Sequence, residues 1–258
     1  MFRQLRIAIL LYILAFAAVG NYLAKARSTD WDDTLWVDLY PINADGSEQT
    51  QAYIDGLRDA DFAAIGAYFA REAHRYGVAL EAPFRIELAS QVTRPIPALP
   101  TDPGILDTML WSLKMRWFAM RVQRDSDRPA PDIQLFALYY DANATQRLDR
   151  STALQRGLIA VAKVFADRAE AGSNQVVMAH ELLHTLGSTD KYVPGTNEPI
   201  YPLGYADPSA APLLPQKRAE LMAGRIPLAN GVAEMPQSLD ETVIGPATAL
   251  EIRWLPTD

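Results

Sequence analysis

The chain is organised around the stretch Ser173-Asn-Gln-Val-Val-Met-Ala-His180-Glu181-Leu-Leu-His184-Thr-Leu-Gly187-Ser-Thr-Asp190. It contains two of the three histidines in the chain, spaced four residues apart, with a glutamate directly after the first. On a helix, side chains four residues apart lie on one face, with their Cβ atoms about 5–6 Å apart. Two imidazoles at that separation can bind one Zn²⁺, and the glutamate can reach a water on the same metal. The spacing therefore predicts a zinc site of hydrolytic type.

A buried helix is expected to carry this site. Ser173 or Asn174 is a suitable N-cap for a helix running from about Gln175 to Leu186. The other faces of that helix are apolar, so the histidines and the glutamate are polar groups in a poor solvent. Buried polar groups need partners, and a metal would satisfy all three together. The alternative is a pair of hydrogen-bonded core histidines with no metal.

The third zinc ligand must come from outside this helix, because a catalytic zinc usually takes three protein ligands. The remaining histidine, His74, lies at the end of a predicted helix, where the helix dipole favours a solvated histidine. Gly187 can adopt a positive φ and end the helix in a sharp turn, after which Asp190 can direct its carboxylate at the metal. The predicted set is His180, His184 and Asp190 as ligands, with Glu181 as the base.

The pattern His-Glu-x-x-His-x-x-Gly-x-x-Asp resembles the metzincin clan of zinc peptidases. It is most similar to variants such as snapalysin, in which aspartate replaces the usual third histidine. The resemblance implies one catalytic Zn²⁺ and peptide-bond hydrolysis, with Glu181 taking the proton of the attacking water. It also implies a methionine-containing turn beneath the zinc, for which Met222 in Glu220-Leu-Met-Ala-Gly224 is the candidate. In fold, the resemblance covers roughly residues 30–258.

Some assignments within this resemblance stay open. Aspartate is uncommon as a third ligand in the clan, and a thermolysin-like arrangement would use a later glutamate: Glu198, Glu220 or Glu234. The oxyanion needs a donor besides the metal. The candidates are Tyr192, Tyr205 and Arg225, of which Tyr192 is preferred.

The resemblance also bears on the substrate cleft. In the clan an antiparallel edge strand binds the substrate backbone, and by position Asp132–Tyr140 would be that strand. An ordinary sheet strand is an equally good interpretation of that segment. The proline-rich segment 192–215 can wall the cleft or form a surface loop.

The rest of the chain predicts one α/β domain with a mixed, twisted sheet and a small C-terminal helical part. Strands are expected at Thr34–Tyr40, closed by Pro41, and at Phe84–Val92, Asp132–Tyr140 and Gly157–Phe165. Helices are expected at Gln51–Tyr76, Ile105–Val122 and Pro246–Trp254. In the helix at Ile105–Val122, the spacing predicts a buried stripe of Leu106, Leu110, Leu113, Trp117 and Met120.

The N-terminus predicts export. Arg3 and Arg6 precede an uncharged run of 18 residues, Ile7–Ala24, close to the about 20 that span a bilayer as a helix. We expect residues 1–26 to be a transmembrane anchor, with residues 27–258 as a catalytic domain outside the cytoplasm. The alternative is a signal peptide cleaved near Ala24-Lys25-Ala26, which would leave a secreted protein.

Composition narrows the partners and the function. A net charge of −7 without a basic cluster argues against nucleic acid, and zero cysteines exclude disulfides and thiolate ligands. The expected partner is a peptide or protein substrate, besides a membrane that holds the N-terminal segment. The leading hypothesis is a zinc metalloendopeptidase. The alternatives are an amidase-like zinc hydrolase and a zinc-binding module without turnover.

Overall fold

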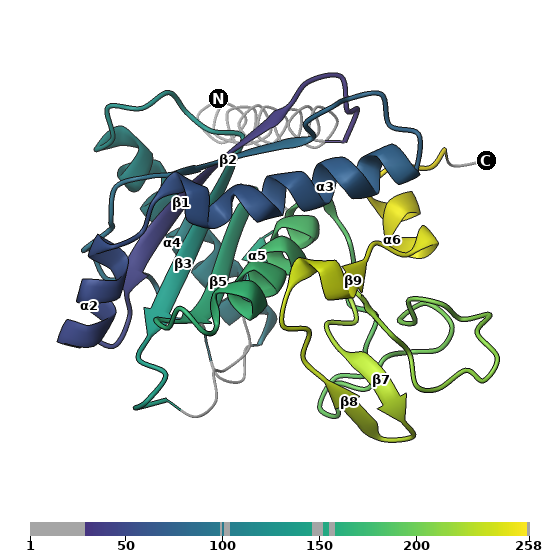
Figure 1. The fold of residues 1–258 in the computed structure, drawn as a ribbon. Coiled ribbons are helices and arrows are strands. Elements are labelled where there is room, and N and C mark those ends of the chain that lie inside the picture. Colours follow the sequence, from purple (N-terminus) through teal and green to yellow (C-terminus); the bar gives the residue numbers. More distant parts are fainter. Residues whose placement is uncertain (1–28, 99, 101–103, 146–151, 155–157, 257–258) are drawn as a thin grey trace, which may run out of the picture.

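The computed structural model describes residues 29–256 except 99, 101–103, 146–151 and 155–157. Its centre is a five-stranded sheet in the order β2-β1-β3-β5-β4 (Figure 1). Strands β2, β1, β3 and β5 run parallel, and β4 pairs antiparallel with β5 at the edge. The predicted α/β fold with a mixed sheet is confirmed. The strands are β1 (Leu35–Asn43), β2 (Phe84–Leu88), β3 (Ile133–Tyr140), β4 (Thr152–Leu154) and β5 (Ile159–Phe165).

Helices cover both faces of the sheet, because the central strands are apolar on both faces. On β3, Leu135, Ala137 and Tyr139 join the core beneath α3 (Ala63–Arg75) and α5 (Ala171–Leu186). The alternate residues Phe136 and Leu138 join a second core beneath α4 (Ile105–Arg124). Two buried faces are the normal state of a parallel sheet. Helix α5 therefore lies between the sheet and the C-terminal segments (Figure 1).

The first half of the chain differs from the predicted elements at three points. The strand expected at Phe84–Val92 ends at Leu88. The helix expected at Gln51–Tyr76 is divided into α2 (Glu48–Asp55), a 3-10 turn (Asp59–Phe62) and α3. Asp61 causes the restart, because its carboxylate accepts the backbone N–H of Arg58 at 2.8 Å and caps the new turn. Strand β1 continues through Pro41, which lacks only an N–H; its carbonyl still accepts from Val92 at 3.0 Å.

Helix α4 presents the opposite face to the one predicted. The stripe expected in the core is exposed, and α4 packs on the sheet through Trp111, Met115, Phe118, Ala119 and Val122. Both faces of α4 carry large apolar side chains, so periodicity alone did not identify the buried one.

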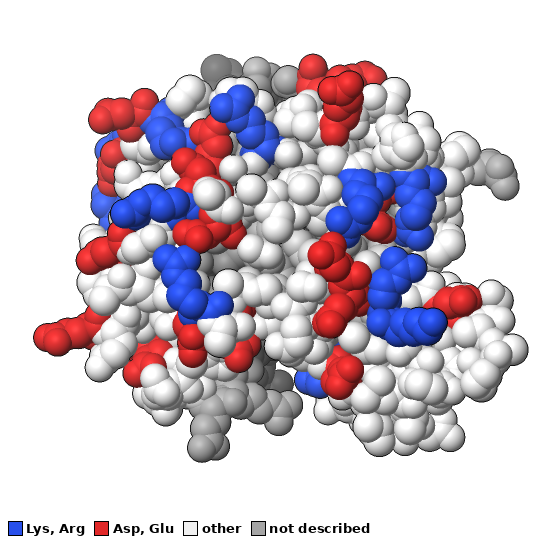
Figure 2. Space-filling view, viewed as in Figure 1, with Lys and Arg blue, Asp and Glu red and all other residues white. Residues whose placement is uncertain are grey.

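The C-terminal part frames the end of α5. It contains two small sheets, β6 (Ala219–Glu220) with β9 (Thr242–Val243) and β7 (Ile226–Ala229) with β8 (Val232–Glu234). A 3-10 turn at Leu239–Glu241 precedes α6 (Pro246–Glu251), which is the predicted C-terminal helix. On the face drawn in Figure 2, side chains of both charge signs are interspersed, so this face has no patch of a single sign.

The structure corrects the predicted membrane assignment. Across the described residues, no helix is both long and apolar enough to cross a membrane. Helix α4 has sufficient length at 20 residues, but it carries Lys114, Arg116 and Arg121. The segment Ile7–Ala24, on which the anchor was based, and the predicted boundary after residue 26 lie outside the described residues.

Candidate metal centre

Helix α5 is held against the sheet by its first turn. The Asn174 side chain accepts the backbone N–H of Phe165 at 2.9 Å and donates to the carbonyl of the same residue at 2.8 Å. Asn174 is therefore not the N-cap, since the helix already begins at Ala171 and its N-cap is Glu170. Gly172 permits this placement, because a Cβ there would lie 2.0 Å from the carbonyl oxygen of Gln237.

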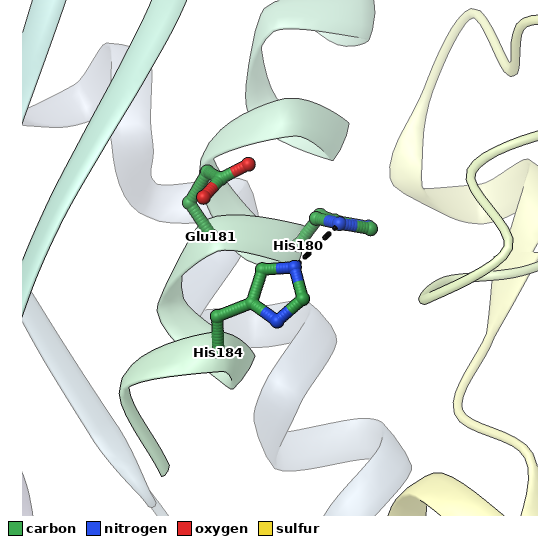
Figure 3. A group of neighbouring side chains, drawn as sticks. All are labelled: His180, Glu181 and His184. Carbon is green, nitrogen blue, oxygen red and sulfur yellow. Dashed lines mark hydrogen bonds between the residues drawn. The ribbon is translucent and has the colours of Figure 1, made fainter. Parts of the chain in front are cut away.

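Three ligand atoms converge at the other end of α5. His180 Nε2 and His184 Nε2 lie 3.0 Å apart, and Asp190 Oδ1 lies 3.2 Å from the first and 3.1 Å from the second. Figure 3 shows the two imidazoles meeting beside the helix, with Glu181 one position along it. Gly187 makes the arrangement possible: it ends the helix with φ at 103°, and the chain then turns back to Asp190.

Backbone carbonyls determine the tautomer of both histidines. His180 Nδ1 lies 2.9 Å from the carbonyl oxygen of Leu221, and His184 Nδ1 lies 2.8 Å from that of Ser188. A carbonyl only accepts, so each Nδ1 carries the hydrogen and each neutral ring presents a lone pair at Nε2. Two lone pairs and a carboxylate oxygen therefore face one point. Such a set could hold a cation between its members.

The contacts between the imidazoles and the carboxylate also shift the pKa values of His180 and Asp190. Burial lowers the pKa of His180, but the contacts with Asp190, the charge of Glu181 and the Leu221 carbonyl together outweigh it, and the net pKa is raised. Burial also acts to raise the pKa of Asp190, yet its contacts with the two imidazoles hold that pKa well below its ordinary value. Asp190 is thus held as a carboxylate by its contacts with the two imidazoles.

Glu181 belongs to the same group. Ligand atoms of His180, Glu181 and His184 all lie within 4.8 Å of one another, and the Glu181 side chain is buried. A carboxylate at that distance can exchange a proton with a water held by the imidazoles.

The turn predicted around Met222 adjoins the site. Its Leu221 carbonyl orients His180, and the Met222 carbonyl accepts the backbone N–H of Lys191 at 2.9 Å, next to Asp190. The Met222 side chain is fully buried in the same core as α5. The turn thus contacts the two segments that carry His180, His184 and Asp190.

The three alternative glutamates lie elsewhere. Glu220 is fully buried, and its carboxylate accepts hydrogen bonds from four partners: the backbone N–H groups of Met222, Ala223 and Gly245 and the hydroxyl of Thr248. Glu220 therefore supports the turn. Glu198 and Glu234 are exposed, on a loop and on β8, and neither belongs to the histidine cluster found among the described residues.

The three candidate oxyanion donors and His74 lie in different parts of the structure. The Tyr192 ring stacks beside His180, with 6.4 Å between centroids, whereas Tyr205 packs edge-on against Tyr201. Arg225 is half-buried just after the Met222 turn, and His74 is exposed in the last turn of α3. Tyr192 is thus the candidate oxyanion donor that lies at the imidazoles.

Strand β3 is not an edge strand. It pairs with β1 on one side and β5 on the other, so its backbone groups are already engaged. The edge position beside β5 belongs to the antiparallel strand β4, which contacts α5.

A partly buried ion pair that the sequence did not indicate positions the Asp190 loop. Lys191 Nζ lies 2.8 and 2.7 Å from the two carboxylate oxygens of Glu251 on α6. Glu251 also accepts hydrogen bonds from Ser188 and from the backbone and hydroxyl of Thr189. Burial raises the pKa of Glu251, but Lys191 and Thr189 more than compensate and lower it. Residues on both sides of Asp190 are thereby tied to α6.

We expect Glu251→Gln to weaken zinc binding about tenfold, as for other residues that orient a ligand. It should also reduce the free energy of unfolding by up to about 3 kcal/mol, because Lys191 is left as a buried, unpaired charge. Zinc titration and urea unfolding measure the two effects. Glu81→Gln, at an exposed carboxylate, is the matched control. Equal zinc affinity in the two variants would contradict the positioning role.

Comparison with known proteins finds no family model that matches the chain and no curated protein that it matches. The candidate function therefore rests on the geometry described above.

Proposed function

We propose that the chain is a zinc-dependent hydrolase that cleaves peptide bonds, with a metzincin-type site. One observation carries the proposal: two Nε2 lone pairs and a carboxylate oxygen converge to within 3.0–3.2 Å of one another. Tetrahedral ligands about 2.0–2.1 Å from zinc lie about 3.3–3.4 Å apart. The donor set therefore fits a zinc ion closely. A single proton could bridge only two of the three atoms.

The ligand set also favours catalysis over a purely structural metal. Three protein ligands leave a fourth position, whereas structural zinc sites are closed by four. When bound, zinc supplies a Lewis acid that acidifies water and polarises a carbonyl. Glu181 takes a proton from the attacking water and then delivers it to the leaving amine. Tyr192 can donate a hydrogen bond to the carbonyl oxygen as that oxygen gains charge.

The sheet supports a peptide as the substrate. Within the part of the chain that the structure describes, β4 has a strand partner on one side only. An extended peptide can add to such an edge through backbone hydrogen bonds, which distinguishes it from a small amide. The proposal therefore assigns the scissile bond to an extended peptide or protein.

Metal removal tests the proposal. We expect the purified chain to hold about one zinc, to lose hydrolysis after chelation, and to regain it with one equivalent of Zn²⁺ but not with Mg²⁺. Thermal unfolding should shift upward with added zinc, because the ion binds the folded state. Zinc content by mass spectrometry and digestion of a peptide library provide the readouts. A chain that neither contains zinc nor responds to it would refute the proposal, and cleavage confined to small amides would replace peptidase with amidase.

A further inference from the structure

Helix α4 carries an apolar stripe on the face turned away from the sheet. Its six side chains are between 55% and 74% exposed: Leu106, Met109, Leu110, Leu113, Trp117 and Met120. At about 100° per residue, all six fall within an arc of about 100° around the helix. The residues that bind the sheet occupy the opposite arc. The stripe is therefore a continuous surface, distinct from the core.

A stripe of this size indicates a binding surface. Six large side chains exposed in one row form an apolar patch of the kind that marks a binding site on a monomer. Isolated apolar side chains on a surface need no explanation, but a continuous row does.

Five of the six residues are arranged symmetrically about Leu113, whereas Leu110, at −3, has Arg116 as its counterpart at +3. Relative to Leu113, the positions of Leu106, Met109, Trp117 and Met120 are −7, −4, +4 and +7. A two-fold interface requires a patch that is complementary to itself. An antiparallel pair of α4 helices centred on Leu113 places Leu106 opposite Met120 and Met109 opposite Trp117.

The charges beside the stripe favour the same pairing. Asp107 lies in the first turn of α4 and Arg121 in the last, and both are exposed on one flank of the stripe. A parallel pair would set like charges side by side. An antiparallel pair brings the Asp107 carboxylate of each copy beside the Arg121 guanidinium of the other, and the two helix dipoles also oppose each other favourably. Lys114 is exposed on the same flank, one residue from the proposed axis, so an antiparallel pair also brings the two Lys114 ammonium groups near each other once. The two Asp107–Arg121 contacts outnumber this one repulsion.

The first described residues pack on the face of the sheet opposite to α4. The described chain enters at Thr29, and the Trp31 ring packs against Phe84 and Trp254 in the core beneath α3 and α5. That core lies on the other side of the sheet from α4. We propose that the stripe on α4 binds a second copy of this chain, through an antiparallel helix pair centred on Leu113.

Cysteine cross-linking tests this arrangement, because the natural chain contains no cysteine. We expect Leu113→Cys to form a disulfide-linked dimer under mild oxidation of the full chain. Leu106→Cys alone should not, because the two copies of residue 106 lie about 21 Å apart in an antiparallel pair, beyond disulfide reach. Mixing Leu106→Cys with Met120→Cys should yield a mixed dimer. Val232→Cys, exposed to a similar extent on β8, is the control for random collision.

Sedimentation of the full chain provides the independent readout. We expect a dimer at about 10–100 µM, as for a small helical interface, and at least a tenfold weaker association for Leu113→Glu, which would bury a charge at the axis. Val232→Glu should leave the association unchanged. A monomeric wild type, a dimer insensitive to Leu113→Glu, or self-linking of Leu106→Cys would each overturn the proposal. The result is independent of zinc, because α4 contributes no ligand.

Discussion

Glu181→Gln should lower peptide hydrolysis by about 10³-fold or more while the chain still holds about one zinc. Glutamine keeps the size of the side chain and the buried position, but it cannot accept a proton from water. The three ligands are untouched, so metal binding should remain. The measurement pairs zinc analysis with initial rates on a peptide found in the library digest.

The control for this variant is Glu198→Gln, which changes an exposed carboxylate on a loop and should leave both quantities unchanged. Full activity in Glu181→Gln would remove Glu181 from the mechanism. If the variant lost zinc as well as activity, Glu181 would be a metal ligand or a structural residue and not the base.

Asp190→Ala is expected to weaken zinc binding by about 100-fold or more, since it removes one of three protein ligands and the negative charge that offsets the ion. It should also reduce hydrolysis to the level of the metal-free chain at limiting zinc. Competition with a chelating dye measures the affinity, and circular dichroism checks the fold. Asp240→Ala, at an exposed aspartate, is the matched control.

Glu220→Ala separates the two ligand assignments. Glu220 accepts four hydrogen bonds in the core, so its loss should destabilise the fold by about 3 kcal/mol or more. Any fraction that folds should still bind zinc. If folded Glu220→Ala lost the metal and Asp190→Ala kept it, the thermolysin-like assignment would replace the one proposed here.

The local parts of the site could be predicted because their partners lie close in sequence. His180 and His184 share a helix face, and Gly187 brings Asp190 back within three residues. The features that orient these ligands could not be predicted. The Leu221 carbonyl that fixes His180 is a backbone atom 41 residues away, and Glu251 meets Lys191 across 60 residues. Contacts between residues so far apart in the sequence leave no periodic pattern from which they could be predicted.

The errors in the fold have a similar origin. Helix α4 is apolar on both faces, so its period identifies a helix but not the side that meets the sheet. Strand β3 was placed at an edge from its position in the chain, but parallel pairing puts it in the middle of the sheet. The helix expected at Gln51–Tyr76 was divided by one local hydrogen bond at Asp61. Each outcome depended on tertiary contacts or a single side chain.

The ion pair between Lys191 and Glu251, which holds the Asp190 loop, also determines when that loop becomes fixed during synthesis. Ribosomes make the loop before α6, and Glu251 follows Lys191 by 60 residues. At a synthesis rate of about 5–20 residues per second, Glu251 is added about 3–12 s after the Asp190 loop that its carboxylate holds. If the proposed site binds zinc, we therefore expect a nascent chain to hold the metal firmly only after α6 has emerged.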